Sequence, residues 1–250
     1  MIPGFRQRLL RGDTLLGTMV TLPTAATAEI LADAGFDWLF IDGEHGPLNS
    51  SDILGILQAV GHRVACLVRV PICDEAEIKK VLDLGAQGVI VPQVNSAEQA
   101  ADVVRYARYA PAGSRGVGLA RAHGYGFRFA EYVGTANENV VVIVQAEHRS
   151  AVENIESIVR VPGVDCVLLG PYDLSASYGL MGQISDPVVT SAIERVTVAC
   201  RTANIPLGYF GISADAVKPY AEQGYRLLVA GVDVLFLGGG ARKMLKDMQT

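Results

Sequence analysis

Four apolar runs of this sequence end in polar or charged residues that can carry acid–base or metal chemistry. The segments are Asp42–Pro47, Arg69, Gln145–Glu147 and Gly170–Ser175. An unpartnered charge at the end of a buried strand is costly, so these groups must be solvated, paired or bound to a ligand. If the runs are strands of one barrel, the mouth at their carboxyl ends brings all four segments together.

Glu147 and Asp173 are the candidate metal ligands. They follow neighbouring apolar runs, and no His or Cys is placed comparably beside them. A site with few ligands, all of them oxygen, suits Mg²⁺ or Mn²⁺, which keep several waters and take further ligands from the substrate. The alternative is that Asp173 caps the following helix and Glu147 pairs with Arg149.

Further candidates for the reaction lie close to these runs. Arg69 can bind a carboxylate or an enolate oxygen with its planar guanidinium, or form a structural ion pair inside the barrel. His45 lies three residues after Asp42, which is placed to orient its ring for acid–base catalysis. Asp83 lies late in a predicted helix, where a carboxylate opposes the helix dipole. We therefore expect Asp83 to have a partner, with His45 as the candidate.

Several kinds of chemistry lack the residues they need. All five lysines fall in predicted helices, so a Schiff-base mechanism has no evident nucleophile. The sequence shows no nucleophile elbow, no phosphate cradle and no glycine-rich nucleotide fingerprint after a strand. The four cysteines lack C-x-x-C spacing, and we expect reduced thiols.

The composition predicts a folded protein with a large core. Half of the 250 residues are hydrophobic, 19% are charged and the mean hydropathy is +0.29, which excludes disordered, collagen-like and coiled-coil chains. The net charge of −5 and the lack of a basic stripe argue against a nucleic-acid partner. The apolar runs are far shorter than the roughly 20 residues that span a bilayer. No signal-peptide pattern is present in residues 1–16, so a cytoplasmic location is expected.

A short apolar run, a turn and a stretch of helical periodicity recur along the chain. We predict eight strands, at Leu16–Val20, Asp37–Asp42, Val64–Arg69, Gly88–Pro92, Val140–Gln145, Asp165–Leu169, Pro206–Phe210 and Arg226–Ala230. Most are apolar along their full length, as expected for parallel strands covered on both faces.

The stretches between the strands read as crossover helices. Four of them, each followed by a glycine, are Thr24–Ala34, Ser50–Val60, Asp74–Leu84 and Ala214–Gln223. The predicted N-caps are Ser50 or Ser51, Asp74, Ser96 and Ser213. Eight strand–helix units without a linker predict one domain over residues 1–250, a (β/α)₈ TIM barrel. An open Rossmann-type sheet is the alternative.

One connection is unusually long. About thirty residues rich in Gly, Arg and aromatic side chains separate the helix ending near Tyr109 from the strand starting at Val140. Such a connection is more often a functional or interface segment than a plain loop. The role of residues 111–135 stays open. Tyr125 in this segment and Phe210 at the end of the seventh strand are candidates for a pocket wall, although ordinary packing is the commoner role.

Taken together, these motifs resemble the HpcH/HpaI aldolase family, and more narrowly its metal-dependent class II pyruvate aldolases. The segments that carry the resemblance are Phe36–His45, Val68–Pro71, Leu82–Gly88, Pro111–Gly118, Gln145–Glu147 and Gly170–Ser175. The resemblance covers essentially the whole chain, and the motifs are highly specific in combination.

The resemblance implies reversible aldol cleavage of a 4-hydroxy-2-oxo acid to pyruvate and an aldehyde, through an enolate held on a divalent cation. Mg²⁺ or Mn²⁺ is expected, with Co²⁺ as a further option. Glu147 and Asp173 would hold this cation, which pyruvate chelates. Arg69 would bind the keto oxygen and stabilise the enolate, and Gln145 would lie beside the metal.

The resemblance also assigns roles around this centre. The backbone at Gly170 and Pro171 would receive the pyruvate carboxylate. His45, supported by Asp42 and Asp83, would transfer protons through water on the metal. A homohexamer built as a dimer of trimers is implied, with the last helix exchanged between subunits and packed on a neighbouring barrel.

Two other functions remain as alternatives. The first is a CoA-thioester lyase of the malyl or citramalyl type, which would need a nucleotide-binding surface that no basic, glycine-rich patch supplies. The second is a non-catalytic barrel kept as a scaffold. The intact set of His45, Arg69, Glu147 and Asp173 argues against the second alternative.

Overall fold

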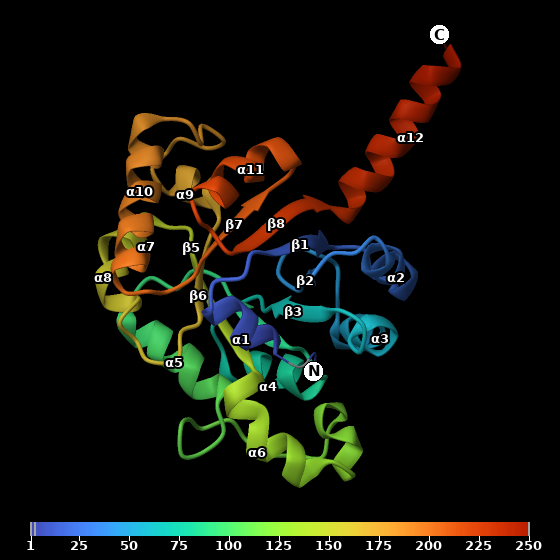
Figure 1. Ribbon diagram of the computed structural model, residues 1–250, viewed down its shortest axis with the longest axis vertical. Helices are drawn as coiled ribbons and strands as arrows, with labels where there is room; N and C mark the ends of the chain where they lie inside the picture. The colour runs from blue at the N-terminus through green and yellow to red at the C-terminus, as the bar shows by residue number, and fades with distance from the viewer. Residues whose placement is uncertain (1, 3, 250) are drawn as a thin grey trace.

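The computed structural model describes residue 2 and residues 4–249, which contain a closed barrel of eight parallel strands (Figure 1). The strands pair in chain order, and β1 pairs with β8 to close the barrel. They are β1 (Leu15–Val20), β2 (Trp38–Asp42), β3 (Ala65–Arg69), β4 (Gly88–Val91), β5 (Val141–Ala146), β6 (Cys166–Leu169), β7 (Leu207–Gly211) and β8 (Leu227–Val232). The predicted (β/α)₈ barrel is confirmed, and the open sheet is excluded.

Helices connect the strands, and most of them surround the barrel. They are α1 (Phe5–Leu10), α2 (Ala25–Asp33), α3 (Ser50–Val60), α4 (Glu75–Asp83), α5 (Ala97–Ala107), α6 (Phe129–Asn139), α7 (Arg149–Glu153), α8 (Ile155–Ile158), α9 (Pro171–Ser177), α10 (Pro187–Thr202), α11 (Ala214–Glu222) and α12 (Asp233–Gln249). The long connection between α5 and β5 contains α6 and a 3₁₀ helix, η1 (Arg121–Gly126).

Three of the predicted N-caps are confirmed and one is wrong. Asp74, Ser96 and Ser213 accept backbone N–H groups at the starts of α4, α5 and α11. Helix α3 is instead capped by Asn49, which forms a reciprocal capping box with Asp52. The reason is that the Asn49 carboxamide oxygen reaches the first free N–H groups, so the serines that follow become helical residues.

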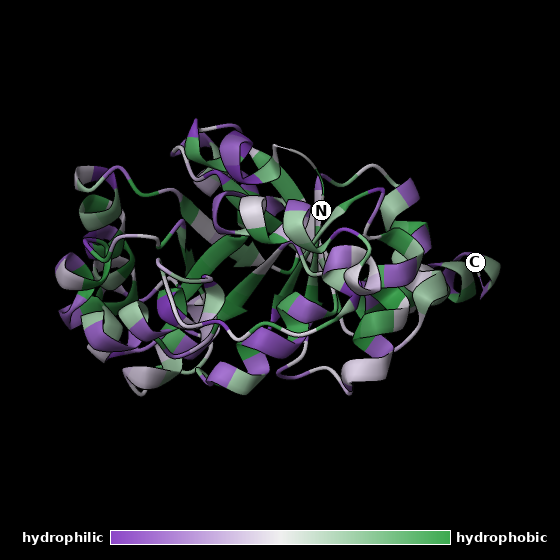
Figure 2. Cartoon of the chain, turned by 90° about the horizontal axis from the view of Figure 1, so that it is seen from below, coloured by the Kyte–Doolittle hydropathy of each residue, from purple (hydrophilic) through white to green (hydrophobic). Residues whose placement is uncertain are grey.

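Strand alternation divides the buried side chains into two cores. One fills the barrel interior and includes Trp38, Leu67, Ile143 and Leu168, with Phe5 of α1 packed against it. The other lies between the strands and the surrounding helices. In Figure 2 the strands at the centre are mostly hydrophobic, whereas the helices alternate between hydrophobic and hydrophilic residues.

The same alternation directs polar side chains into the mouth of the barrel. Phe40 and Ile143 belong to the interior core, so Asp42 and Gln145, two residues later in β2 and β5, face the same side. The register of β2 and β3 pairs Asp42 directly with Arg69. Polar residues at the carboxyl ends therefore meet above an apolar floor.

Helix α12 extends away from the barrel (Figure 1). Many of its side chains are large, apolar and exposed, including Leu235, Leu237, Met244, Leu245 and Met248. Within residue 2 and residues 4–249, no helix has both the length and the apolar character needed to cross a membrane.

Candidate active site

A cavity of about 250 Å³ opens at the carboxyl ends of the strands. Most of the predicted site residues line it: Asp42, His45, Arg69, Gln145, Gly170, Pro171, Asp173 and Phe210. Met19, Thr21, Phe40 and Tyr172 complete the wall. The structure thus brings together side chains from the ends of six different strands or the loops that follow them.

Arg69 is held between two carboxylates. Its Nε and Nη2 atoms donate to the two carboxylate oxygens of Asp42 at 2.9 and 2.8 Å, and Nη1 lies 2.9 Å from Glu44 Oε2. Burial opposes the charge on Arg69, but these carboxylates and Glu147 outweigh burial and raise the pKa of Arg69. Arg69 therefore forms the structural ion pair considered above and also presents its charge to the cavity.

Asp42 is fixed from several directions. Burial alone would raise its pKa, but Arg69 and the backbone N–H groups of Glu44 and His45 outweigh burial and lower it. The turn that supplies these N–H groups depends on Gly43, whose own N–H donates to the Arg69 carbonyl oxygen at 3.0 Å. A Cβ at Gly43 would lie 2.6 Å from that oxygen, so the turn requires glycine.

His45 reaches the cavity in a different manner from the one predicted. Asp42 accepts the backbone N–H of His45 at 3.3 Å and does not bind its ring. The ring Nε2 lies 3.8 Å from Glu44 Oε2, and the side chain is 68% exposed. Glu44, not Asp42, is therefore the acidic neighbour of the imidazole.

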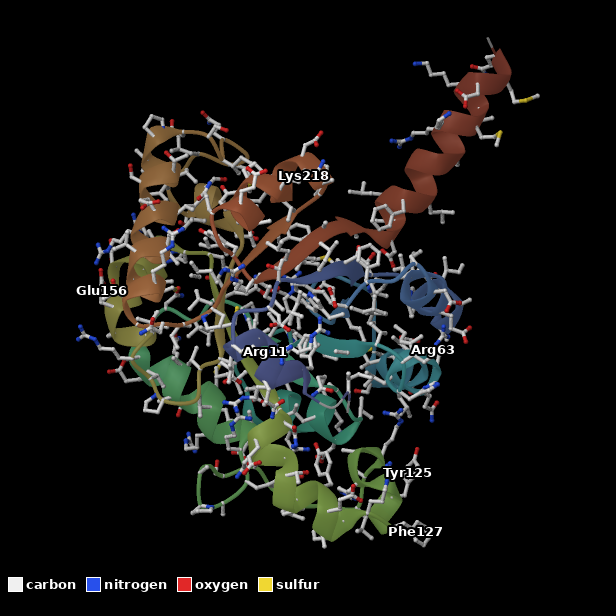
Figure 3. All side chains as sticks on the ribbon, in the orientation of Figure 1. Arg11, Arg63, Tyr125, Phe127, Glu156 and Lys218 are labelled. Carbon is white, nitrogen blue, oxygen red and sulfur yellow. The ribbon has the colours of Figure 1, made fainter. Side chains whose placement is uncertain are left out.

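Asp83 and Tyr125 lie elsewhere within this chain. Asp83 accepts a 2.7 Å hydrogen bond from Arg115, and both Asp83 and Tyr125 line a separate cavity beside α4 and η1. Because α4 runs back along the barrel, its last residue, Asp83, lies near the amino ends of the strands. Tyr125 is 62% exposed at the edge of the molecule (Figure 3). Within one chain, the expected contact of Asp83 with His45 and the expected pocket wall at Tyr125 are not formed.

Both carboxylate oxygens of Glu147 are positioned by hydrogen bonds. Oε1 accepts the backbone N–H of Gln93 at 2.9 Å, and Oε2 accepts the Gln145 side chain at 2.7 Å. Gln93 has φ of 53°, a left-handed conformation that is unfavourable for residues other than glycine. A Cβ at Gly170 would lie 2.8 Å from Glu147 Oε2, so glycine makes room for the carboxylate. Among the described residues, no ion pair joins Glu147 to Arg149.

The electrostatics of these residues fit a hard cation. Burial, increased by the charges of Asp173 and Glu44, raises the pKa of Glu147 to about 7, although Gln93 and Arg69 oppose the shift. In the described part of the chain, no group of three or more His, Cys, Asp or Glu side chains is arranged to hold a metal. Glu147 and Asp173 would thus supply two oxygen ligands, and waters and substrate the rest, as Mg²⁺ and Mn²⁺ accept.

The raised pKa of Glu147 makes the metal-free protein less stable as the pH rises. Between its unfolded pKa of 4.5 and the folded value of about 7, the native state binds more protons than the unfolded state. The free energy of unfolding should therefore fall across this window, by about 3 kcal/mol at most. Asp42, whose pKa is lowered, affects stability only at pH values below this window.

Urea unfolding in EDTA at pH 5 and pH 7.5 measures this effect. Glu147→Gln is the matched variant, because it removes the titration and keeps the shape of the side chain. We expect the difference in unfolding free energy between the two pH values to be smaller in the variant. An equal pH dependence in both proteins would contradict the assigned shift.

The four cysteines carry free thiols, as predicted. Burial raises the pKa of Cys66 and of Cys200 to about 12. Both thiols stay protonated near neutral pH, which makes them poor nucleophiles there.

Several residues of the site were not singled out from the sequence. Glu44 contacts Arg69, and Thr21 lines the cavity. Gln93 binds Glu147 through its backbone N–H. Asp233, at the start of α12, accepts a hydrogen bond from Thr21. Glu44 and Asp233 follow apolar runs, so the pattern that identified Asp42 also applied to them. The role of Gln93 depends on a backbone angle, for which the sequence carries no signal.

Carboxylates, an arginine and a histidine gathered at the carboxyl ends of the strands of a (β/α)₈ barrel are typical of an enzyme active site. The family model described as HpcH/HpaI aldolase/citrate lyase matches residues 16–237. The chain belongs to this family, as the sequence motifs predicted, and it is an enzyme of the aldolase class.

Individual relatives cover nearly the whole chain. The 4-hydroxy-2-oxovalerate aldolase of Rhodococcus jostii is 42% identical over 94% of this chain and 92% of its own length. The hydroxypyruvate/pyruvate aldolase of Roseovarius nubinhibens is 38% identical over 98% of this chain and 96% of its own. A crystal structure of an aldolase/citrate lyase family protein from Burkholderia cenocepacia superimposes with a TM-score of 0.95 at 38% identity and covers 99% of both chains.

Proposed function

We propose that this enzyme cleaves 4-hydroxy-2-oxo acids reversibly to pyruvate and an aldehyde, with the whole chain acting as one barrel domain. In the cleavage direction the C4 hydroxyl loses its proton and C4 becomes the aldehyde carbon. The electron pair of the C3–C4 bond passes into the enolate of pyruvate, and C3 then takes up a proton. The names of the similar aldolases from Rhodococcus and Roseovarius support this substrate class.

Each side chain of the site has its own role in the proposed reaction. Glu147 and Asp173 hold a divalent cation, Mg²⁺, Mn²⁺ or Co²⁺, which supplies a Lewis acid for the 2-oxo group. Arg69 stabilises the negative charge that develops on the enolate oxygen. His45 transfers the proton in this reaction. Asp42 holds Arg69 and the turn that contains His45 in place. Asp83 is also proposed to support His45. Within one chain, however, Asp83 binds Arg115 and does not contact His45.

Other residues position the substrate. Gln145 orients Glu147 through their 2.7 Å hydrogen bond. The backbone around Gly170 and Pro171 receives the carboxylate of the 2-oxo acid, and Phe210 forms part of the wall. Tyr125 lies on the surface of its own chain, so it would reach a pocket only in a neighbouring subunit.

One observation carries the proposal. Glu147 is buried, and its pKa is raised to about 7 by burial and by the charges of Asp173 and Glu44. Arg69, Asp173 and Gln145 line the cavity, and Gln145 donates to Glu147. Two acids that repel each other beside a fixed positive group can hold a cation and a bidentate 2-oxo acid together.

Metal removal tests the proposed function. Pyruvate release from a panel of 4-hydroxy-2-oxo acids should stop after EDTA treatment and return with Mg²⁺, Mn²⁺ or Co²⁺. Turnover that EDTA leaves intact would contradict the metal role. Competition by free CoA would instead favour a thioester lyase.

We also propose a homohexamer, a dimer of trimers, in which α12 packs on a neighbouring barrel. The support is the exposed apolar surface of α12, because contiguous exposed apolar side chains mark interaction surfaces. A cytoplasmic location is proposed for the same enzyme, with no nucleic acid among its partners.

A further inference from the structure

Thr21 lines the same cavity as Arg69 and Asp173 but has no part in the reaction described above. It follows the last residue of β1, two positions after Met19 of the interior core. Its hydroxyl donates to Asp233 Oδ1 at 2.7 Å. The position of Thr21 and the direction of its hydroxyl proton are therefore both set by Asp233.

Asp233 acts only as an acceptor. It is 3% exposed, and its Oδ2 accepts the backbone N–H groups of Thr21 at 2.9 Å and Leu22 at 2.8 Å. Its Oδ1 accepts the backbone N–H of Val234 at 2.8 Å in addition to the Thr21 hydroxyl. Three of these four donors are backbone N–H groups, which have no lone pair to offer, and the fourth is the Thr21 hydroxyl, so Asp233 accepts at both of its oxygens.

A threonine hydroxyl has one proton. That proton is committed to Asp233, so the Thr21 oxygen can meet a cavity ligand only with a lone pair. A carbonyl or carboxylate oxygen of a substrate cannot bond to it, whereas a hydroxyl can.

We propose that Thr21 determines specificity by accepting a hydrogen bond from a substrate hydroxyl, and that Asp233 is the residue that positions it. This inference rests on the proposed aldolase function and deepens it. The hydroxyl has two sources: C3 of the 2-oxo acid donor, as in 3-hydroxypyruvate, or C2 of the aldehyde, as in 2-hydroxypropanal. Both present the same chemistry to Thr21.

Matched substrates separate the two sources. Aldol addition is measured with pyruvate and 3-hydroxypyruvate on propanal, and with pyruvate on propanal and 2-hydroxypropanal. For each pair, kcat/KM of the hydroxylated substrate is divided by that of the plain one. The wild-type protein, Thr21→Val, Thr21→Ala and Thr21→Ser are compared with the metal present.

Thr21→Val should lower this ratio about fivefold in one of the two pairs, because it replaces the acceptor with a methyl group of similar size. Thr21→Ala should do the same, and Thr21→Ser, which keeps the hydroxyl, should keep the wild-type ratio. The pair that responds identifies the source of the hydroxyl. Calorimetric titration of 3-hydroxypyruvate and pyruvate without aldehyde gives an independent readout of the donor arm.

Asp233→Asn tests the positioning role. If the amide oxygen keeps the bonds to Thr21 and Leu22, its NH₂ group faces the Thr21 hydroxyl and donates to it. The hydroxyl proton is then free to turn toward the cavity, and the amide takes one of the two lone pairs of Thr21. The ratio should therefore fall although Thr21 is intact, but by less than in Thr21→Val.

Two failures are distinguishable. A wild-type protein that adds none of these aldehydes to either donor would overturn the proposed function together with this inference. An active wild-type protein whose ratios are unchanged in Thr21→Val and Thr21→Ala would overturn the role of Thr21 alone.

Discussion

Replacing Arg69 with alanine is expected to lower kcat by about 10²–10³-fold, the usual loss when one group that stabilises a developing oxyanion is removed. Arg69 presents a fixed positive charge at the cavity and is held there by Asp42 at 2.8 and 2.9 Å. Its geometry is set before substrate binds, so no reorganisation is needed during the reaction. Steady-state pyruvate release, measured with saturating 4-hydroxy-2-oxo acid and metal, gives this loss directly.

The control must separate catalysis from folding. Arg69→Ala leaves the buried Asp42 carboxylate without its partner, which costs about 3–5 kcal/mol in typical buried pairs. Urea unfolding and the fraction of folded protein are therefore measured beside kcat. Arg69→Lys keeps a charge but loses the bidentate geometry and should recover only part of the activity. Arg195→Ala removes an arginine from an exposed pair with Glu156 and should change neither property. A folded Arg69→Ala protein with near wild-type kcat would contradict the assigned role.

Replacing either proposed metal ligand with its amide should remove both metal binding and turnover. Glu147→Gln and Asp173→Asn keep the size of each side chain but remove the charge that a hard cation requires. We expect kcat/KM to fall by about 10²–10⁴-fold, corresponding to the several kcal/mol that a Lewis acid contributes. Mn²⁺ binding, followed by electron paramagnetic resonance without substrate, should weaken in parallel.

Glu44→Gln is the matched comparison for this experiment. Glu44 is an acid of the same site, and burial raises its pKa too, but it pairs with Arg69. Its replacement should weaken Mn²⁺ binding far less than either ligand change. If Glu44→Gln abolishes Mn²⁺ binding while Glu147→Gln preserves it, the ligand assignment is wrong.

The residues that meet at the barrel mouth were predictable because strand geometry is regular. Asp42, Arg69 and Gln145 lie at the ends of apolar runs, and in a parallel barrel such ends converge. The strands were predicted to within a residue or two for the same reason, since each is a short run in which nearly all side chains are buried.

Contacts that depend on where a helix ends in space or on how a turn orients a side chain were not predictable in the same way. Asp83 was expected beside His45 because a carboxylate late in a helix opposes the dipole and needs a partner. However, α4 carries Asp83 to the opposite end of the barrel, where Arg115 binds it. In the turn at Gly43, the backbone N–H of His45 donates to Asp42, and the imidazole does not contact Asp42. The ring lies near Glu44 instead. No spacing rule distinguishes a backbone contact from a side-chain contact in such a turn.

Asp233 is both the first residue of α12 and the acceptor that fixes the turn after β1. In the proposed assembly, quaternary structure and substrate preference would therefore depend on one side chain. If α12 packs on a neighbouring barrel as proposed, that contact restrains the first residues of the helix, and we expect dilution into free subunits to weaken discrimination between substrates at Thr21. Among the described residues, no hydrogen bond or ion pair joins Glu147 or Asp173 to α12, so the affinity for the cation should not change on dilution.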